Sequence, residues 1–455
     1  MVRSSKNPFS KQSNINNIFS FLLLVLIAIS PIPFGSNRPI FWTISGFFIA
    51  LMMLIYLFLL YLNGSRIRHN IAKSKWLVLL FIALLFYIIL QIIPFNLWVI
   101  KSQNFAYAAL EITSKTISLA PSVSFLSFIQ FASYGLLFFF ILQLAHNTER
   151  ARWMLISLFI IVVIYACYSL FTLTQSNSPI FYMPELAYRK YATATFVNRN
   201  SFATFLSFGL IIGSAFAVFS FAQEQKRDLL TALLYILGVA IIIAALFATQ
   251  SRMGFAAGLV GSIITILLVA LKTPKAKLLI LPVLLFAFIS IAILTYLYGQ
   301  GLLDRLGSTE SAFDGRMLLY NQILTMISSR PFLGFGAGSF ELTFPLFHQL
   351  PLSPDIVWDL AHNSYLALWA EMGIIFGSIP IILVIMITIK AIKNYRKTQY
   401  RWLHSVITLG VVITAAMHSL VDFSLEIQAV AYLFVAILAI GISGASKSRK
   451  KNENV

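Results

Sequence analysis

The sequence predicts an all-α, polytopic integral membrane protein with about twelve transmembrane helices and one large helical loop on the extracytoplasmic side. Hydrophobic residues make up 59% of the chain and charged residues only 11%, whereas soluble proteins contain about 45–50% apolar and about 25% charged residues. The apolar residues fall in runs long enough to cross a membrane, and lysine and arginine fall between the runs. We interpret residues 1–455 as a single transmembrane domain.

Each predicted span is a mostly apolar run close to the length of about 20 residues that crosses the hydrocarbon core as a helix. Proline, glycine or charged residues bound several of these runs, as expected for helix ends. The predicted spans are residues 18–34, 40–62, 76–94, 123–145, 153–175, 201–222, 230–249, 254–271, 278–297, 362–389, 403–421 and 427–444.

The distribution of lysine and arginine predicts the orientation of the spans, because cytoplasmic connections carry an excess of both. The N-terminus and every second connection after it hold 23 of the 33 Lys and Arg residues, and the other side holds 10. We therefore predict that both termini are cytoplasmic. Acidic residues balance the ten outer cations, so the net charge of +18 lies almost wholly in the cytoplasm, where it suits anionic lipids. No nucleic-acid partner is expected.

Cysteine and histidine usage limits the chemistry available to the chain. Cys167 is its one cysteine and lies in an apolar run, which excludes a disulfide framework and a cysteine-based metal site. The six histidines are scattered, so no cluster has the spacing of metal ligands. We expect neither a metal nor a cofactor.

The longest polar interval is the predicted loop 298–361, which is too long for a simple connector and should contain a helix. From Gly315 to Ile327 apolar residues recur at helical spacing. Asp314 fits the N-cap of this helix, and Arg330-Pro331 fits its end. Packing gives no reason to gather cations and a histidine on one rim of a membrane protein. We therefore interpret this loop and the helix after it as the active face.

Arg252 lies between two spans that have almost no connecting residues. Its guanidinium must lie at the interface or point into a cavity between helices. One interpretation is an interfacial arginine that extends toward water. The other, which we favour, is a functional group, because ionisable side chains at membrane depth usually face the bundle interior.

Arg316 falls in the first turn of the predicted loop helix, where a cation opposes the helix dipole. A guanidinium can bind phosphate oxygens through two parallel hydrogen bonds. Arg252 and Arg316 could therefore clamp a diphosphate without a metal. The alternative is that Arg316 pairs with an acidic residue of the loop: Asp304, Glu310 or Asp314. Two further arginines of the loop are expected to be solvated or interfacial, namely Arg305 and Arg330.

His362 is the strongest single candidate for a catalytic group, since it begins a predicted span at the base of the polar loop. A neutral imidazole there could take a proton from an attacking hydroxyl. The alternative is an interfacial histidine bonded to a backbone carbonyl. Asn363 and Tyr365 accompany it as candidate substrate-binding residues. Glu371 is nine residues further on, about half a turn out of phase, so it should face away and needs a partner elsewhere.

Three weaker signals accompany these residues. The polar group Asn198, Arg199 and Asn200 could bind sugar or simply cap a helix. Gly336 and Gly338 permit close backbone approach to a substrate. His418 and Asp422 share a helix face, and we expect a structural pair that ties one helix to a neighbour more than a catalytic one.

Several short blocks of the chain resemble, in order, those of the O-antigen ligase and Wzy-type polysaccharide polymerase family. The similarity runs over about residues 190–425, which we interpret as a ligase/polymerase-like core that includes the loop 298–361, and the twelve-span plan also agrees. The segment His418 to Phe423 resembles a late motif of exopolysaccharide polymerases. The blocks are Phe196-Val197-Asn198-Arg199-Asn200, Ser251-Arg252-Met253-Gly254, Pro331 through Gly338, and His362-Asn363-Ser364-Tyr365-Leu366 with Glu371-Met372-Gly373.

The resemblance implies a metal-independent, inverting GT-C type glycosyltransferase in the bacterial inner membrane, with its active face in the periplasm. The donor would be a glycan on undecaprenyl diphosphate, and the acceptor would be another glycan or the lipid A core. Arg252 and Arg316 would hold the diphosphate, and His362 would activate the acceptor hydroxyl. Membrane lipids and a chain-length regulator protein are the further partners expected.

Several functions remain open at this stage. The His418 motif favours a polymerase over a ligase that attaches O-antigen to lipid A core, and a protein O-oligosaccharyltransferase is a third acceptor class. A flippase for lipid-linked oligosaccharides is the rival from another class. Transporters tend to carry repeats and buried charges near the midplane, whereas here the polar residues gather at one face. A non-catalytic scaffold would leave the arginine and histidine rim unexplained.

Overall fold

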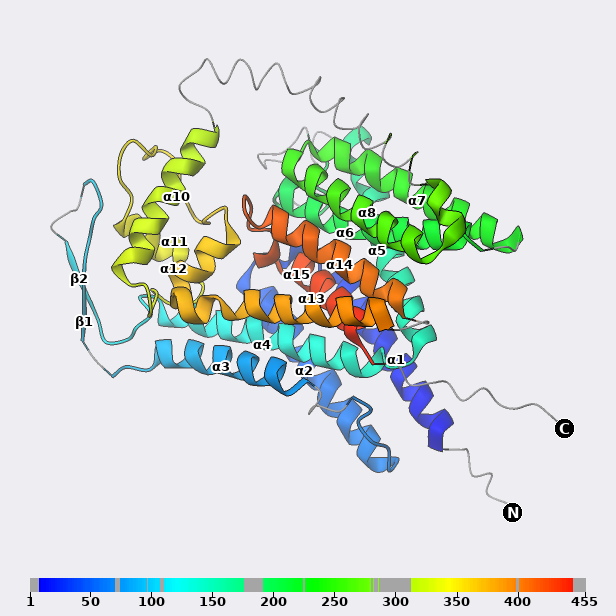
Figure 1. Cartoon of the computed structure of the whole chain (residues 1–455). Helices are drawn as coiled ribbons and strands as arrows, with labels where there is room; N and C mark the ends of the chain where they lie inside the picture. Colours follow the sequence, from blue (N-terminus) through cyan, green and yellow to red (C-terminus); the bar gives the residue numbers. More distant parts are fainter. Residues whose placement is uncertain are drawn as a thin grey trace.

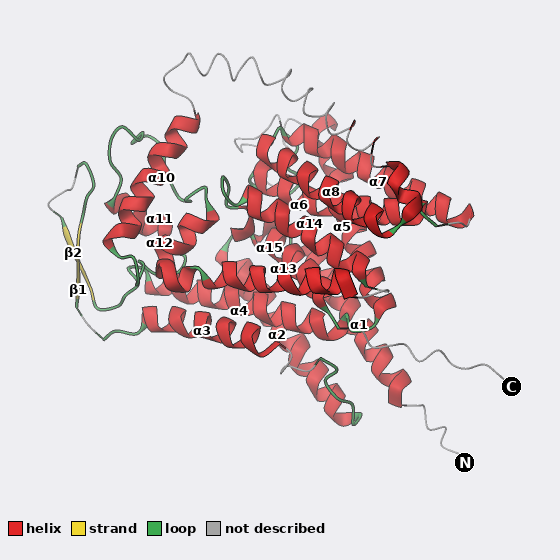
Figure 2. Cartoon of the chain, viewed as in Figure 1, coloured by secondary structure: helices red, strands yellow, loops and turns green. Residues whose placement is uncertain are grey.

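The computed structural model is about 75% helical, and its helices run side by side in a bundle (Figures 1 and 2). It describes residues 8–69, 74–95, 97–106, 110–175, 191–223, 226–279, 281, 285, 312–397 and 401–444. The predicted span 278–297 lies almost wholly outside these residues, as do Asp304, Arg305 and Glu310 of the predicted loop.

Eight described helices are long and apolar enough to cross a membrane, and each overlaps one of the first eight predicted spans. Their lengths follow from uninterrupted apolar sequence, and proline stands in the first turn of several of them, where its missing N–H costs no hydrogen bond. These helices are α1 (Pro8–Ile29), α2 (Pro39–Leu62), α3 (Lys75–Ile92), α4 (Pro121–Leu144), α5 (Thr148–Gln175), α6 (Arg199–Phe221), α7 (Lys226–Thr249) and α8 (Arg252–Lys272).

The predicted span 362–389 is not one continuous helix. The segment forms α12 (Ser364–Gly377) and α13 (Ile379–Lys397), which are bent by 70° at their junction. Gly373 within α12 adopts φ 69° and ψ 165°, a conformation that favours glycine. The last two predicted spans are the shorter helices α14 (Trp402–His418) and α15 (Gln428–Ile442). The described residues therefore do not fix the predicted count of twelve spans.

The polar loop contains the predicted helix as α10 (Ala312–Ser329), followed by α11 (Phe340–Thr343) and η4 (Phe344–Leu346). The proposed N-cap is wrong, because Asp314 lies inside α10. Apolar residues of α10 and of the segment after it form a small core of their own, which includes Leu319, Ile323 and Phe335. This core holds α10 against the end of the bundle beside α12 (Figure 1).

One small sheet was not predicted. Strand β1 (Trp98–Lys101) pairs antiparallel with β2 (Glu111–Ser114), with Ile100 opposite Ile112 and Lys101 opposite Glu111. Ile100 packs into the loop core. Short 3-10 turns complete the connections: η1 (Phe34–Ser36), η3 (Pro274–Leu279) and η5 (Ser424–Glu426).

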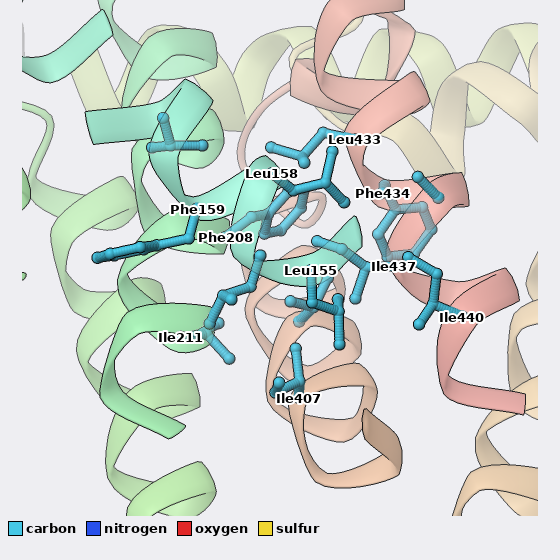
Figure 3. Packing of buried hydrophobic residues seen from close by; sticks show 14 of the residues in the cluster. Leu155, Leu158, Phe159, Phe208, Ile211, Ile407, Leu433, Phe434, Ile437 and Ile440 are labelled. Carbon is cyan, nitrogen blue, oxygen red and sulfur yellow. The ribbon is translucent and has the colours of Figure 1, made fainter. Parts of the chain in front are cut away.

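Helix α6 lies at the centre of the main core and is buried along almost its whole length. Figure 3 shows Phe208 and Ile211 of α6 among side chains of α5, α14 and α15. Gly209 and Gly213 let α5 approach closely, since a Cβ at either position would overlap Val162 or Phe159. Helix α6 is thus held rigidly by its packing.

The two ends of the bundle differ in composition. At the end rich in lysine and arginine, buried Arg401 donates to the carbonyls of Ala145 (3.2 Å) and Ser443 (2.9 Å), and Arg150 donates to Asn17 Oδ1 at 2.7 Å. These contacts join the start of α1, the end of α4 and the end of α15. The opposite end carries the connections in which the candidate site residues lie.

Candidate active site

His362 lies immediately before α12, with the left-handed backbone angle φ 50°. Its ring packs edge-on against Phe423 at a centroid distance of 5.0 Å and faces Trp358 at 6.2 Å. Nδ1 is buried and has no hydrogen-bond partner in the described part of the chain. Nε2 likewise forms no hydrogen bond with the described residues.

The charges around His362 favour a neutral imidazole. Burial lowers its pKa, the carboxylates of Asp422 and Asp359 act in the opposite direction, and the cation of Arg316 lowers it further. The net shift is downward from the ordinary value of about 6.5. At neutral pH the ring is thus unprotonated and can accept a proton.

Arg316 and Tyr320 lie four residues apart on α10 and so share one face of that helix. The Tyr320 hydroxyl donates to the backbone carbonyl of His362 at 2.8 Å and also reaches that of Leu420 at 3.4 Å. This contact brings α10, and Arg316 with it, over His362. The electrostatic effect of Arg316 on both His362 and Tyr320 agrees with that placement.

The turn that carries Arg252 reaches the same end of the bundle. Ser251 precedes it, and its hydroxyl donates to Asn200 Oδ1 at 2.8 Å. Asn200 Nδ2 in turn donates to Asp422 Oδ1 at 3.2 Å. Asp422 adjoins Phe423, whose ring contacts His362. The Arg252 side chain itself is exposed at the start of α8.

Residues 237–381 match the family model described as O-Antigen ligase. This matched segment is similar to the O-antigen ligase domain and covers about a third of the chain. The family resemblance drawn from the sequence is thereby confirmed, and the match includes Arg252, Arg316 and His362. No match is found among curated proteins.

Two elements that complete the site lie outside the matched O-antigen ligase domain. One is the start of α6 with Asn200, and the other is the segment from His418 to Ser424. His418 Nδ1 bonds Thr204 Oγ1 at 2.6 Å, Thr204 Oγ1 donates to Ser424 Oγ at 2.9 Å, and Ser424 donates to Asp422. His418 and Asp422 thus tie the end of α14 to α6, although through two hydroxyl groups and not directly.

The asparagine and tyrosine side chains predicted to bind substrate form hydrogen bonds with the protein itself. Asn198 caps α6 by accepting from the backbone N–H of Asn200 at 2.7 Å. Asn363 caps α12 through two backbone N–H groups and donates to the Leu420 carbonyl at 2.9 Å. The hydroxyl of Tyr365 donates to the Ala416 carbonyl at 3.0 Å. Asn198 therefore stabilises the start of α6, and Asn363 and Tyr365 hold the start of α12 against the end of α14 and the segment after it.

Arg199, also predicted to bind substrate, has a partner within the protein as well. Its guanidinium lies over the Tyr191 ring, 4.2 Å from the ring centroid. Arg330 was expected to be solvated or interfacial, but it is half-buried in the structure. Its guanidinium lies 5.1 Å from the Trp98 ring centroid and 5.3 Å from the Phe335 ring centroid, and it donates to the Ile117 carbonyl at 3.1 Å.

The glycines predicted to admit a substrate pack closely against neighbouring serines. A Cβ on Gly336 would overlap Ser118, and one on Gly338 would overlap Ser127 of α4. The Glu371 carboxylate accepts from the backbone N–H groups of Gly338 (2.8 Å) and Phe340 (3.3 Å). Glu371 was predicted to need a partner elsewhere in the chain, and these two backbone amides are that partner. Within the described residues no group of three His, Cys, Asp or Glu side chains could hold a metal ion.

Proposed function

We propose that this protein is a membrane glycosyltransferase that transfers or polymerises glycan from a polyprenyl-diphosphate-linked donor on the periplasmic face of the bacterial inner membrane. The observation that carries the proposal is the meeting of His362 with the α10 face that bears Arg316, at the bundle end that also holds the Arg252 turn. The O-antigen ligase domain supports an enzyme of the ligase or polymerase type.

The proposed reaction is one displacement at the anomeric carbon of the donor sugar. Nε2 of His362 takes the proton from an acceptor hydroxyl as that oxygen forms the new glycosidic bond. The bond between the anomeric carbon and the diphosphate breaks, and the polyprenyl diphosphate leaves with the bonding electron pair. Attack from the opposite side inverts the anomeric configuration. The imidazolium then returns its proton to water.

Two guanidinium groups would stabilise the leaving diphosphate. Arg316 lies on the helix that contacts His362, and Arg252 is exposed on the turn joined to Asp422 through Asn200. Charge-assisted hydrogen bonds to phosphate oxygens strengthen as negative charge develops on the leaving group. This arrangement assigns to arginine the charge stabilisation that a metal ion supplies in other transferases.

Features of the sequence support the proposed membrane face and acceptor. The excess of lysine and arginine at the opposite end favours a periplasmic location for the His362 end. The polymerase is favoured over the ligase by the His418 to Phe423 segment, which here forms part of the wall of the site. A ligase that uses lipid A core, or a protein O-oligosaccharyltransferase, would use the same donor chemistry with another acceptor.

The decisive experiment incubates purified protein with a defined polyprenyl-diphosphate repeat unit, with and without EDTA, and sizes the products. We expect longer glycans with wild-type protein in both conditions and none with His362→Ala or Arg316→Ala present at equal amount in the membrane. Undiminished product from both variants would contradict the site. Addition of lipid A core as the acceptor separates ligase from polymerase. Movement of the lipid-linked unit across liposomes without extension would instead identify a flippase.

A further inference from the structure

Asp422 is a carboxylate buried at the centre of the site. Its side chain is 1% exposed. Oδ1 accepts from Asn200 Nδ2 at 3.2 Å and Oδ2 accepts from the Ser424 hydroxyl. Within the described residues these donors are both neutral, and no lysine or arginine forms an ion pair with it. Hydrogen bonds from neutral groups of two other segments thus fix the position of this carboxylate.

The segment around Asp422 forms the wall behind His362. Ser364 donates from its backbone N–H to the Ser419 carbonyl at 3.0 Å and from its hydroxyl to the Asp422 carbonyl at 3.3 Å. Asn363 Nδ2 donates to the Leu420 carbonyl at 2.9 Å. With the contact between Phe423 and His362, these bonds fix the position of the carboxylate relative to the imidazole.

The same carboxylate holds the Arg252 turn. The Asn200 side chain bonds to both segments. Its Nδ2 donates to Asp422, and its Oδ1 accepts from Ser251, the residue before Arg252. One amide thus joins segments that supply the base and one of the proposed diphosphate ligands. Displacement of Asp422 would change both at once.

We propose that Asp422 is a positioning residue for the transfer reaction, holding the Arg252 turn in register with His362 and stabilising the imidazolium that His362 becomes. This inference rests on the proposed function. It gives a role in the reaction to a group that lies outside the family match, which ends at residue 381, and that the sequence predicted to be structural.

The other charged groups around His362 do little to stabilise a positive charge on its ring. Arg316 on α10 opposes a second positive charge on the ring, and Asp359, on the loop before α12, is exposed to solvent that screens it. Burial, with the nearby carboxylates of Glu371 and Asp422, raises the pKa of Glu426 well above its usual range, so Glu426 stays neutral. Among these groups Asp422 is the buried carboxylate whose effect on His362 opposes that of Arg316.

The test compares Asp422→Asn with Asp359→Asn, an equal change of charge at an exposed neighbour. The amide introduced by Asp422→Asn would keep the shape of the side chain and could still accept from Asn200. We expect kcat to fall on the order of tenfold with little change in KM, and the acid limb of the pH profile to move to lower pH by roughly one unit. Asp359→Asn should shift the limb by less, because solvent screens that carboxylate.

A second readout does not depend on activity. The reaction of diethyl pyrocarbonate with His362, followed by mass spectrometry across pH, reports the protonation of this one ring. Asp422→Asn should lower its midpoint by the same amount. If wild-type protein transfers no glycan but the midpoint still moves, the proposed function fails and the electrostatic link stands.

A purely structural role for Asp422 predicts a different result: a lower thermal transition, with the pH profile and the midpoint of His362 unchanged per folded molecule. That result would overturn the proposal. If Asp422→Asn fails to accumulate, Asn200→Ala tests the same link with the charge retained. It should lower kcat and leave the midpoint of His362 in place, and unchanged kcat in that variant would likewise count against the proposal.

Discussion

The substitution Gly373→Ala should remove much of the stability of the fold, although it adds a single methyl group. Gly373 has φ 69° and ψ 165°, and an added Cβ would lie 2.3 Å from the carbonyl oxygen of Phe332. Backbone strain of this kind costs about 1–3 kcal/mol, and forcing an extra carbon into packed structure costs about 1–3 kcal/mol more. Together they remove roughly 2–6 kcal/mol from a total stability of about 5–15 kcal/mol.

The assay is the thermal transition of detergent-purified protein, measured by size exclusion after heating. Gly315→Ala in α10 is the matched control, because nothing lies within 4 Å of a Cβ at that position. Alanine replaces glycine in a helix there, which should stabilise α10 by about 1 kcal/mol or less. A Gly373→Ala protein as stable as wild type would refute the reasoning that this glycine permits contact between α12 and the loop.

Three further outcomes are expected. Asn363→Ala should lower the thermal transition by an amount that corresponds to about 2–4 kcal/mol, since it removes the cap of α12 and leaves the Leu420 carbonyl without its Asn363 donor; a normal transition with a raised KM would instead support direct substrate binding. Transfer activity should decline only at pH values below about 6.5, because the pKa of His362 lies below its ordinary value and the neutral ring is the active form; a pH–rate profile with an acid limb centred above 7 would contradict this. Arg401→Lys should destabilise the protein by about 3 kcal/mol, because an ammonium group cannot reach the carbonyls of both Ala145 and Ser443, and detergent melting would detect the loss.

The elements that follow from local sequence were predicted well. The apolar periodicity from Gly315 to Ile327 gave α10, and each of the first eight predicted spans overlaps one long apolar helix. The failures involve contacts between distant segments. The backbone of Gly373 depends on Phe332, and the partner of Glu371 is a pair of main-chain amides, a kind of donor that no side-chain pattern reveals. The bond between Asn200 and Asp422 joins residues 222 positions apart, so spacing could not indicate it.

The bend between α12 and α13 sets the direction in which the chain runs from α13 back to His362. α12 meets α13 at 70°, and the backbone of Gly373 adds a second break within α12. A straight continuation of α13 would carry His362 outward along the axis of α13, whereas the bend carries it mostly sideways. Under the proposed function, a lipid carrier anchored by its tail would then present its phosphates to His362 without leaving the bilayer.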